Sequence, residues 1–228
     1  MENEKLDGNP ASKIKRKPEN NDRIRFLSTD EEKTLTKVIR ENWPHYLPVF
    51  LLSIHTGMRA SEQLWLRWND VELQGRVLTL WKTKPGTTRH VPLNSVALKQ
   101  FLVLKAKTKS GFIFRNTEGD RLRATRDCFE PAVAEAGLTD YPWHCNRHTF
   151  ASRLVMAGVD IRTVAQLMGH STIQMTMRYA HLAPEHNSAA IERLVGFKTP
   201  GRVESSDRLV AKSVTGKSRR LGKSLKPA

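Results

Sequence analysis

Two segments in the first half of the chain display long cationic side chains that could hold an anion. In HTGMRASE, Arg59 follows a turn at Gly57, and Glu62 lies three residues further on, on the same face of a predicted helix. In WKTKPGTTRHVPL, Lys84 stands at the tip of a predicted β-hairpin, where its side chain can reach over a neighbouring site. Guanidinium and ammonium groups presented in this way are suited to binding a phosphate.

Two segments in the second half add histidines, another arginine and a tyrosine. WHCNRHTF carries His144 and Arg147 three residues apart, so both project together from the start of a predicted helix. LMGHSTIQMTMRYAHL contains His170 and, nine residues later, Tyr179, which follows an arginine directly. A tyrosine hydroxyl becomes a nucleophile when a neighbouring group accepts its proton.

Each segment also has an ordinary structural explanation. Arg59 and Glu62 could form a surface ion pair worth less than about 1 kcal/mol, and Lys84 could be a solvated turn residue. His144 and Arg147 could cap or pair structurally, and Tyr179 could be a half-buried core residue. The chemical interpretation therefore depends on the segments occurring together.

The charge balance favours nucleic acid as the partner. Lys and Arg number 38 against 23 Asp and Glu, which gives a formal net charge of +15. A surplus of this size attracts polyanions, although basic tails on a soluble protein are the alternative explanation. Neither GxGxxG nor GxxxxGK[ST] occurs, so side chains must hold any phosphate.

Other functional classes find little support. Cys128 and Cys145 form neither a disulfide framework nor a CxxC motif, which fits a reducing cytosol. The polar N-terminus does not resemble a secretory signal, and the apolar run LPVFLLSI is far shorter than the roughly 20 residues that span a bilayer. His144 and His148 have a spacing that can hold zinc on a helix, but HExxH and a carboxylate ligand are missing. We therefore expect a cytoplasmic protein without a metal, another cofactor, a small-molecule substrate or a membrane partner.

Apolar spacing and turn residues predict a mainly α (α+β) fold, helical with one small antiparallel β-sheet. Ser28 or Thr29 can cap the first helix, and an apolar segment that ends at Gly57 follows it. Two strands are expected within 76–93, and GFIF is expected to form a further short strand. Helices are predicted at 26–42, 59–70, 94–107, 122–136, 144–157, 160–168 and 171–182.

Taken together, the segments resemble those of one family, the tyrosine recombinases, which include the phage-type integrases. They occur in the family's order and cover residues 24–197. Asn146 departs from the family's pattern, which usually has leucine there, and a buried amide at that position needs hydrogen-bond partners. The matching segments are TGMRASE with Arg59, Lys84 followed by RHVPL, HCNRHTFASRLVMAG with His144 and Arg147, LMGHST with His170, and MTMRYAHLAP with Tyr179.

The resemblance implies cleavage and rejoining of DNA. Arg59 and Arg147 would hold the non-bridging oxygens of a phosphodiester, with His170 as a further donor and Glu62 in a supporting role. These groups would stabilise the negative charge that develops as phosphorus becomes five-coordinate.

The resemblance also assigns the bond-making steps. Tyr179 would attack the phosphorus, Lys84 would protonate the departing 5′ oxygen, and His144 would accept the proton of the tyrosine. The product would be a 3′-phosphotyrosyl link that a second 5′-hydroxyl can reverse, and neither ATP nor metal is implied.

The tyrosine segment cannot be one straight helix if both of its polar groups serve one phosphate. Helical rise would separate His170 from Tyr179 by about 13 Å. We therefore expect a turn at Gly169 with a helix cap at Ser171. The segment then either folds back over the site or swings in when DNA binds.

Composition divides the chain into three expected parts. These are a basic linker or arm at 1–25, a catalytic domain at 26–197 and a basic disordered tail at 198–228. The resemblance implies a separate core-binding domain before the catalytic one, and we expect that domain to be absent from this sequence.

The expected partner is double-stranded DNA, bound by a homotetramer in a bacterial or phage-derived, nucleoid-associated setting, as the resemblance implies. A type IB topoisomerase-like enzyme and a DNA-binding remnant without efficient recombination are the alternatives. Besides the catalytic set, the candidate DNA-binding residues are Lys13, Lys15, Arg16, Lys17, Lys82 and Arg89.

Overall fold

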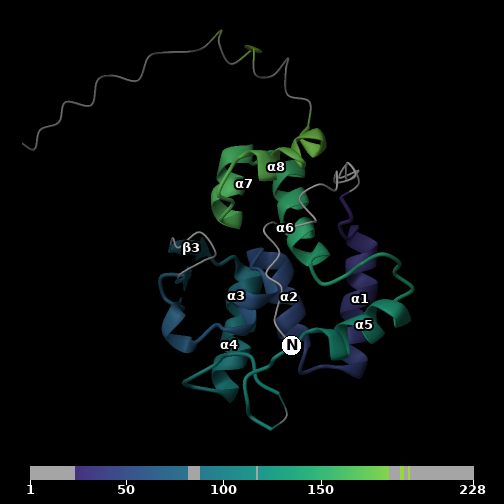
Figure 1. The fold of residues 1–228 in the computed structure, drawn as a ribbon, viewed down its shortest axis with the longest axis vertical. Helices are drawn as coiled ribbons and strands as arrows, with labels where there is room; N and C mark the ends of the chain where they lie inside the picture. Colours follow the sequence, from purple (N-terminus) through teal and green to yellow (C-terminus); the bar gives the residue numbers. More distant parts are fainter. Residues whose placement is uncertain (1–23, 82–87, 117, 185–190, 193–194, 196–228) are drawn as a thin grey trace, which may run out of the picture. The chain divides into compact units, whose positions relative to one another are not determined.

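The computed structural model describes residues 24–81, 88–116, 118–184, 191–192 and 195 (Figure 1). Residues 24–184 belong to one compact unit, which ends at Glu185. All but the last two residues of the predicted arm, the whole predicted tail and the hairpin tip with Lys82 and Lys84 lie outside the described residues.

The unit is mainly helical, and most helices agree with the predicted segments. Among the described residues, two 3₁₀ turns accompany them, η2 (Trp68–Asp70) and η3 (Ala180–Leu182). In chain order the helices are α1 (Thr29–Asn42), α2 (Leu47–Thr56), α3 (Ala60–Leu64), α4 (Ser95–Lys107), α5 (Arg126–Glu135), α6 (Cys145–Met156), α7 (Ile161–Met168) and α8 (Gln174–Met177).

A small antiparallel sheet follows α3. The predicted hairpin is confirmed as β2 (Val77–Leu80) and β3 (Arg89–Pro92), and a short strand that the sequence did not predict, β1 (Val71–Glu72), pairs with β2. The strand order is β1-β2-β3. Leu78 faces Val91 across the hairpin, and both side chains are buried.

Long-range backbone pairing replaces two of the predicted elements. The helix expected over 59–70 ends at Leu64, because the Trp68 N–H donates to the Gly111 carbonyl 3.1 Å away. The strand expected at 111–114 is wrong as well, since that segment forms only an isolated bridge, from Phe112 to Arg67 in the chain after α3.

Two later helices are shorter than the periodicity suggested. Helix α5 begins at Arg126 instead of 122, because the Leu122 N–H donates to the Phe114 carbonyl. The segment 171–182 divides into α8 and η3. This division lets the chain change direction near the site.

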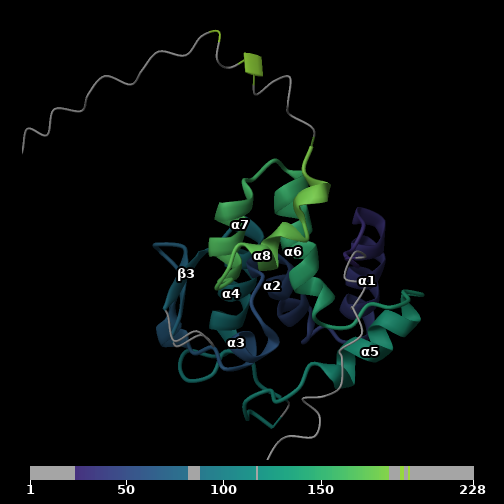
Figure 2. The ribbon, with the colours of Figure 1, turned by 45° about the horizontal axis from the view of Figure 1, so that its top comes forward.

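The apolar core is centred on α2, which packs against α4 and α6. Phe50 of α2, Phe101 of α4 and Phe129 of α5 are each at most 1% exposed. A second, smaller cluster joins α6, α7 and Tyr179, which lies two residues after α8, and Figures 1 and 2 both show these helices side by side. No helix in the described part of the chain is long and apolar enough to cross a membrane.

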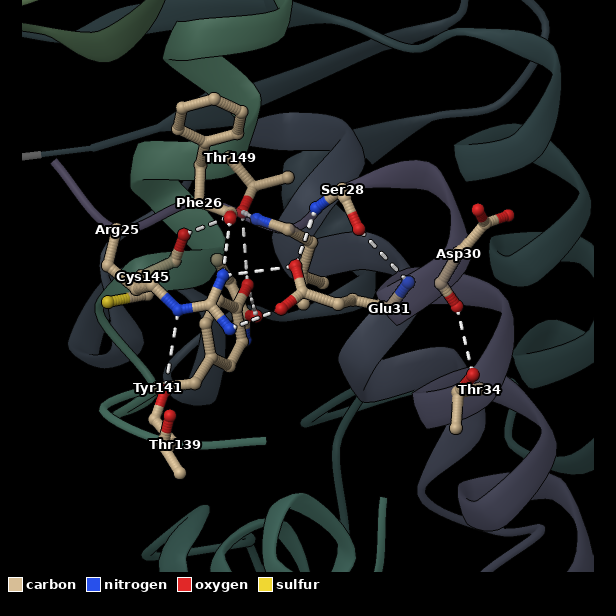
Figure 3. Close-up of polar contacts among 12 residues, drawn as sticks. Arg25, Phe26, Ser28, Asp30, Glu31, Thr34, Thr139, Tyr141, Cys145 and Thr149 are labelled. Atoms are coloured by element: carbon tan, nitrogen blue, oxygen red, sulfur yellow. Dashed lines mark hydrogen bonds and ion pairs between the residues drawn. The ribbon is translucent and has the colours of Figure 1, made fainter. Parts of the chain in front are cut away.

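The start of α1 is tied to α6 by a polar network (Figure 3). Ser28 caps the helix, and Glu31 accepts from the Ser28 N–H at 2.8 Å and from Arg25 at 2.6 Å. The hydrogen bond from Arg25 holds the pKa of Glu31 at about 2. The Leu27 N–H then donates to the Thr149 hydroxyl of α6 at 3.0 Å. These contacts fix α6 relative to α1.

Asn146 occupies a buried polar position in the first turn of α6. Its side-chain oxygen accepts from the Tyr141 hydroxyl at 2.8 Å, and that hydroxyl also lies 3.0 Å from the hydroxyl of Thr149. The amide nitrogen of Asn146 has no hydrogen-bond partner within the described residues. The expected need for partners is therefore half satisfied, by a tyrosine that the sequence did not single out.

Candidate active site

Arg59 is positioned by the turn between α2 and α3. Gly57 ends α2 with φ of 60°, in the left-handed region that glycine adopts without strain. Arg59 then precedes α3, and its Nη1 donates to Glu62 at 2.8 Å. Its Nη2 donates to the Gly169 carbonyl at 3.3 Å, which joins this turn to the end of α7.

Glu62 also binds a second arginine, and this arginine is buried. Arg89 of β3 is 8% exposed, and its two Nη atoms donate to the Glu62 carboxylate at 3.1 and 2.9 Å. Burial raises the pKa of Glu62, but the charge of Arg89 and hydrogen bonds from both arginines outweigh it and leave the pKa below its usual value. A Cβ at Gly169 would collide with the Arg89 guanidinium. Arg89, which we expected to contact DNA, therefore orients Glu62 from beneath the surface.

Arg147 lies deeper still and joins two loops. It is 3% exposed, and it donates to the Met168 carbonyl at 2.5 Å and to the Gly57 carbonyl. Burial, together with the charges of Arg59 and Arg89, lowers the pKa of Arg147 to about 9. At neutral pH it still carries a positive charge at the start of α6.

The predicted turn before the tyrosine segment is confirmed at Gly169, which has φ of 63° and ends α7. The chain then folds back so that His170 Nδ1 lies 2.7 Å from the Thr176 hydroxyl. The Tyr179 N–H donates to the carbonyl of the same threonine at 2.9 Å. Helix α8 begins without a side-chain cap, so the cap predicted at Ser171 is wrong.

Tyr179 is held against α6 by His148, which the sequence analysis weighed only as a possible zinc ligand together with His144. Its side chain is 1% exposed, and its hydroxyl lies 2.6 Å from His148 Nδ1. Burial raises the pKa of Tyr179 to about 12, although Arg178 and Arg147 oppose the change. Burial and His144 lower the pKa of His148 to about 4, so its imidazole is neutral at pH 7 and can accept the phenolic proton.

These active-site side chains line one hollow. It has a volume of about 500 Å³, and its wall includes five of the six residues predicted to be catalytic; Lys84 lies outside the described residues. Among the residues that the structure describes, no group of three or more His, Cys, Asp or Glu side chains could hold a metal ion. The lining residues are Arg59, His144, Arg147, His148, His170, Gln174, Met175, Arg178 and Tyr179.

The half-buried histidines His148 and His170 predict a loss of stability in mild acid. Burial lowers the pKa of both His148 and His170 to about 4, whereas histidine in an unfolded chain titrates near 6.5. Below pH 6.5 the unfolded chain therefore binds more protons, and the free energy of unfolding decreases as the pH falls. Because both rings are partly exposed, we expect a loss on the order of 1–2 kcal/mol between pH 6.5 and 5.

Urea denaturation at pH 7, 6 and 5 measures this effect, because the window lies above the titration of Glu31 and Glu62, whose pKa values are lowered. The double variant His148→Gln/His170→Gln is the control, and it should show a clearly flatter pH dependence. An unchanged dependence in the double variant would assign the effect to other groups.

Comparison with known proteins shows the family to which this chain belongs. Residues 25–186 match the model of the phage integrase family. The chain belongs to this family. The match includes every described side chain of the hollow and ends close to the boundary of the compact unit.

Individual members of the phage integrase family are similar over most of this chain. The integrase of Salmonella phage P22 is 30% identical over 223 residues, which is 89% of this chain and 56% of that protein. The catalytic domain of bacteriophage HP1 integrase is 31% identical with a TM-score of 0.62, and the match covers 75% of this chain and 95% of that domain.

A further solved structure with a similar fold contains DNA. The Tn1549 transposon integrase, in complex with circular intermediate DNA, gives a TM-score of 0.66 at 23% identity and covers 82% of this chain and 72% of that one, a likeness of fold. The chain spans about half the length of the phage P22 integrase.

Proposed function

We propose that this chain cleaves and rejoins DNA strands through Tyr179, as the catalytic part of a site-specific recombinase. The observation that carries the proposal is that Tyr179 lines one hollow together with three arginines and three histidines. A phosphodiester is an anion that gains charge during attack, so it needs several positive or N–H donors beside the nucleophile.

Two arginines and a histidine are assigned to the phosphate. Arg147 uses two of its five N–H groups on backbone carbonyls, which leaves three for phosphate oxygens. Arg59 is similarly held by one carboxylate and one carbonyl. If the Thr176 hydroxyl donates to His170 Nδ1, the Nε2 of that ring carries the proton and can donate to a phosphate oxygen.

The proton of Tyr179 is assigned to His148. The two groups are 2.6 Å apart, whereas His144, our candidate from the sequence, stands next to His148 with ring centroids 4.8 Å apart. His144 is then a second proton carrier or a phosphate donor at the rim of the hollow.

Cleavage of the phosphodiester forms one bond, breaks one bond and moves two protons. The Tyr179 oxygen bonds to phosphorus, the bond from phosphorus to the 5′ oxygen breaks, and His148 takes the phenolic proton. Lys84 protonates the 5′ oxygen, a role that remains a prediction. Attack by a 5′-hydroxyl on the phosphotyrosyl link reverses the sequence and joins the strands.

The proposal also includes the substrate, the assembly and the cellular setting. We propose duplex DNA as the substrate, a homotetramer as the assembly on DNA, and a nucleoid-associated role in a bacterium or phage host. The basic residues Lys13, Lys15, Arg16, Lys17 and Lys82 are proposed as further DNA contacts.

A suicide substrate tests the function. Binding sequences are first selected from a random DNA pool. The selected duplexes are then nicked at successive positions, so that cleavage close to the nick releases a short fragment that carries the new 5′-hydroxyl and diffuses away. We expect a detergent-stable protein–DNA adduct in the presence of EDTA, with the modified peptide containing Tyr179. Tight DNA binding without an adduct at any nick position would instead identify a binding protein.

A further inference from the structure

A second basic surface lies apart from the active-site hollow, and its arginines form a cluster. Arg67, Arg115, Arg121 and Arg123 line a hollow of about 410 Å³ together with Phe112, Asp120 and two glycines. Three of the four arginines are exposed and Arg121 is partly buried. In the described part of the chain none of the four forms an ion pair with a carboxylate, so the cluster keeps its positive charge.

Aromatic rings hold two of these guanidinium groups in place. Arg67 lies 4.4 Å from the ring centroid of Phe112, and Arg121 lies 3.9 Å from that of Trp65. The two rings pack edge to face with centroids 6.0 Å apart. Stacking orders a guanidinium through its faces and leaves most of its N–H edges available for an anion.

The backbone beneath the cluster is fixed as well. Isolated antiparallel bridges join Arg67 to Phe112 and Arg115 to Arg121. Arg115 also donates to the carbonyls of Phe112 at 3.0 Å and Ser110 at 2.7 Å. The cluster is therefore ordered before any ligand arrives, which lowers the entropic cost of binding.

A third hollow shares wall residues with both the arginine cluster and the active-site hollow. It has a volume of about 610 Å³, and it shares Arg59 with the active-site hollow and Arg67 with the cluster. Between them stand Trp65 and Trp81, which are 58% and 64% exposed. The three hollows therefore adjoin one another in a row, from the active-site hollow with Tyr179 to the hollow with the four arginines.

We propose that the arginine cluster binds backbone phosphates of the duplex arm beside the cleaved phosphodiester. The proposal rests on the proposed function, because the active-site phosphate supplies the starting point of the path. Repeated planar donors suit the regular phosphates of a DNA strand, and charge neutralisation there adds affinity that depends on salt but not on sequence. An acidic protein segment is the competing occupant, and it would make the cluster irrelevant to DNA affinity.

The experiment compares DNA arms of different lengths with matched charge variants. The test variant is Arg67→Gln/Arg123→Gln, and Arg67→Lys/Arg123→Lys keeps the charge in the same places. The control is Lys37→Gln/Arg40→Gln, which removes the same charge from exposed positions of α1 outside the three hollows. Affinity is measured for a selected duplex whose arm is shortened in steps on either side of the cleavage site.

We expect the test variant to bind the long duplex about tenfold more weakly and to lower the slope of log Kd against log salt by about 2, or about 1 per lost phosphate contact. The lysine variant should keep most of that slope, and the control should resemble the unmodified protein. The defect should vanish below one arm length, at which covalent trapping through Tyr179 continues unchanged.

Equal affinities and slopes for the test variant and the control would overturn the proposal, and the acidic-protein alternative predicts this result. A defect of the same size at every arm length would also overturn it, because the cluster would then not act on the arm. If the unmodified protein forms no adduct but the arm-length dependence remains, the proposed function fails while the phosphate site stands.

Discussion

Replacing Tyr179 by phenylalanine should abolish the covalent protein–DNA complex while leaving DNA affinity nearly unchanged. Phenylalanine fills the same apolar space beside Val164 and Met168, so the ring remains buried. The only group removed is the hydroxyl that would attack phosphorus. The hydrogen bond to His148 is lost with it, which costs about 1 kcal/mol of stability.

The measurement is adduct formation on the nicked duplex, with filter binding of the same duplex as the control for affinity. His148→Gln is the matched variant, and we expect it to slow trapping by about 100-fold without abolishing it, because general-base help is lost while the nucleophile remains. Its rate should also lose the dependence on the ionisation of the histidine.

The other tyrosines are poor substitutes for the nucleophile. Burial raises the pKa of Tyr46 and Tyr141, and their hydroxyls are engaged with the Thr125 carbonyl and the Asn146 side chain. An adduct that persists in the Tyr179→Phe variant would require a different nucleophile and a different mechanism.

Glu62→Ala should cause the largest loss of stability among single substitutions in the site. It removes the carboxylate that neutralises Arg89, which is 8% exposed, and leaves that charge buried without a partner. Removing one member of a buried ion pair costs about 3–5 kcal/mol. Trapping should also fall, because Arg59 loses the hydrogen bond that orients it.

Urea denaturation of Glu62→Ala, Glu62→Gln and Glu62→Gln/Arg89→Met separates charge from packing. We expect Glu62→Gln to be less destabilised than Glu62→Ala. The double variant should recover part of the lost stability, because it removes the unpaired charge of the buried Arg89 and leaves only the more exposed Arg59 without its carboxylate partner. A loss below about 1 kcal/mol for Glu62→Ala would mean that the pair behaves like an exposed surface bridge.

The sequence was sufficient to predict which segments approach one another, but it did not predict every contact within the site. The turn at Gly169 could be predicted because a straight helix would separate His170 from Tyr179. Which histidine lies beside the Tyr179 hydroxyl depends on how the chain after α7 folds back against α6, and non-local packing sets that path. His144 and His148 both stand near the start of α6, so spacing alone does not distinguish them.

Arg89 shows a signal that was present and not used. Burial alternates along β3, with Arg89 and Val91 inward and His90 and Pro92 outward. Alternation with period two places an arginine that neighbours an inward valine at i+2 on the buried face. The broken helix after Leu64 had no such local signal, because its end is set by pairing with Gly111, a residue far along the chain.

The brace that Arg147 makes has a consequence for how this protein acquires its chemistry. Its guanidinium joins the Gly57 carbonyl before α3 to the Met168 carbonyl at the end of α7, so two regions more than a hundred residues apart meet at one cation. A nascent or partly melted chain that lacks either loop has no such junction. We therefore expect the proposed strand cleavage to require the completely folded chain, because only that chain holds Arg147 between both loops.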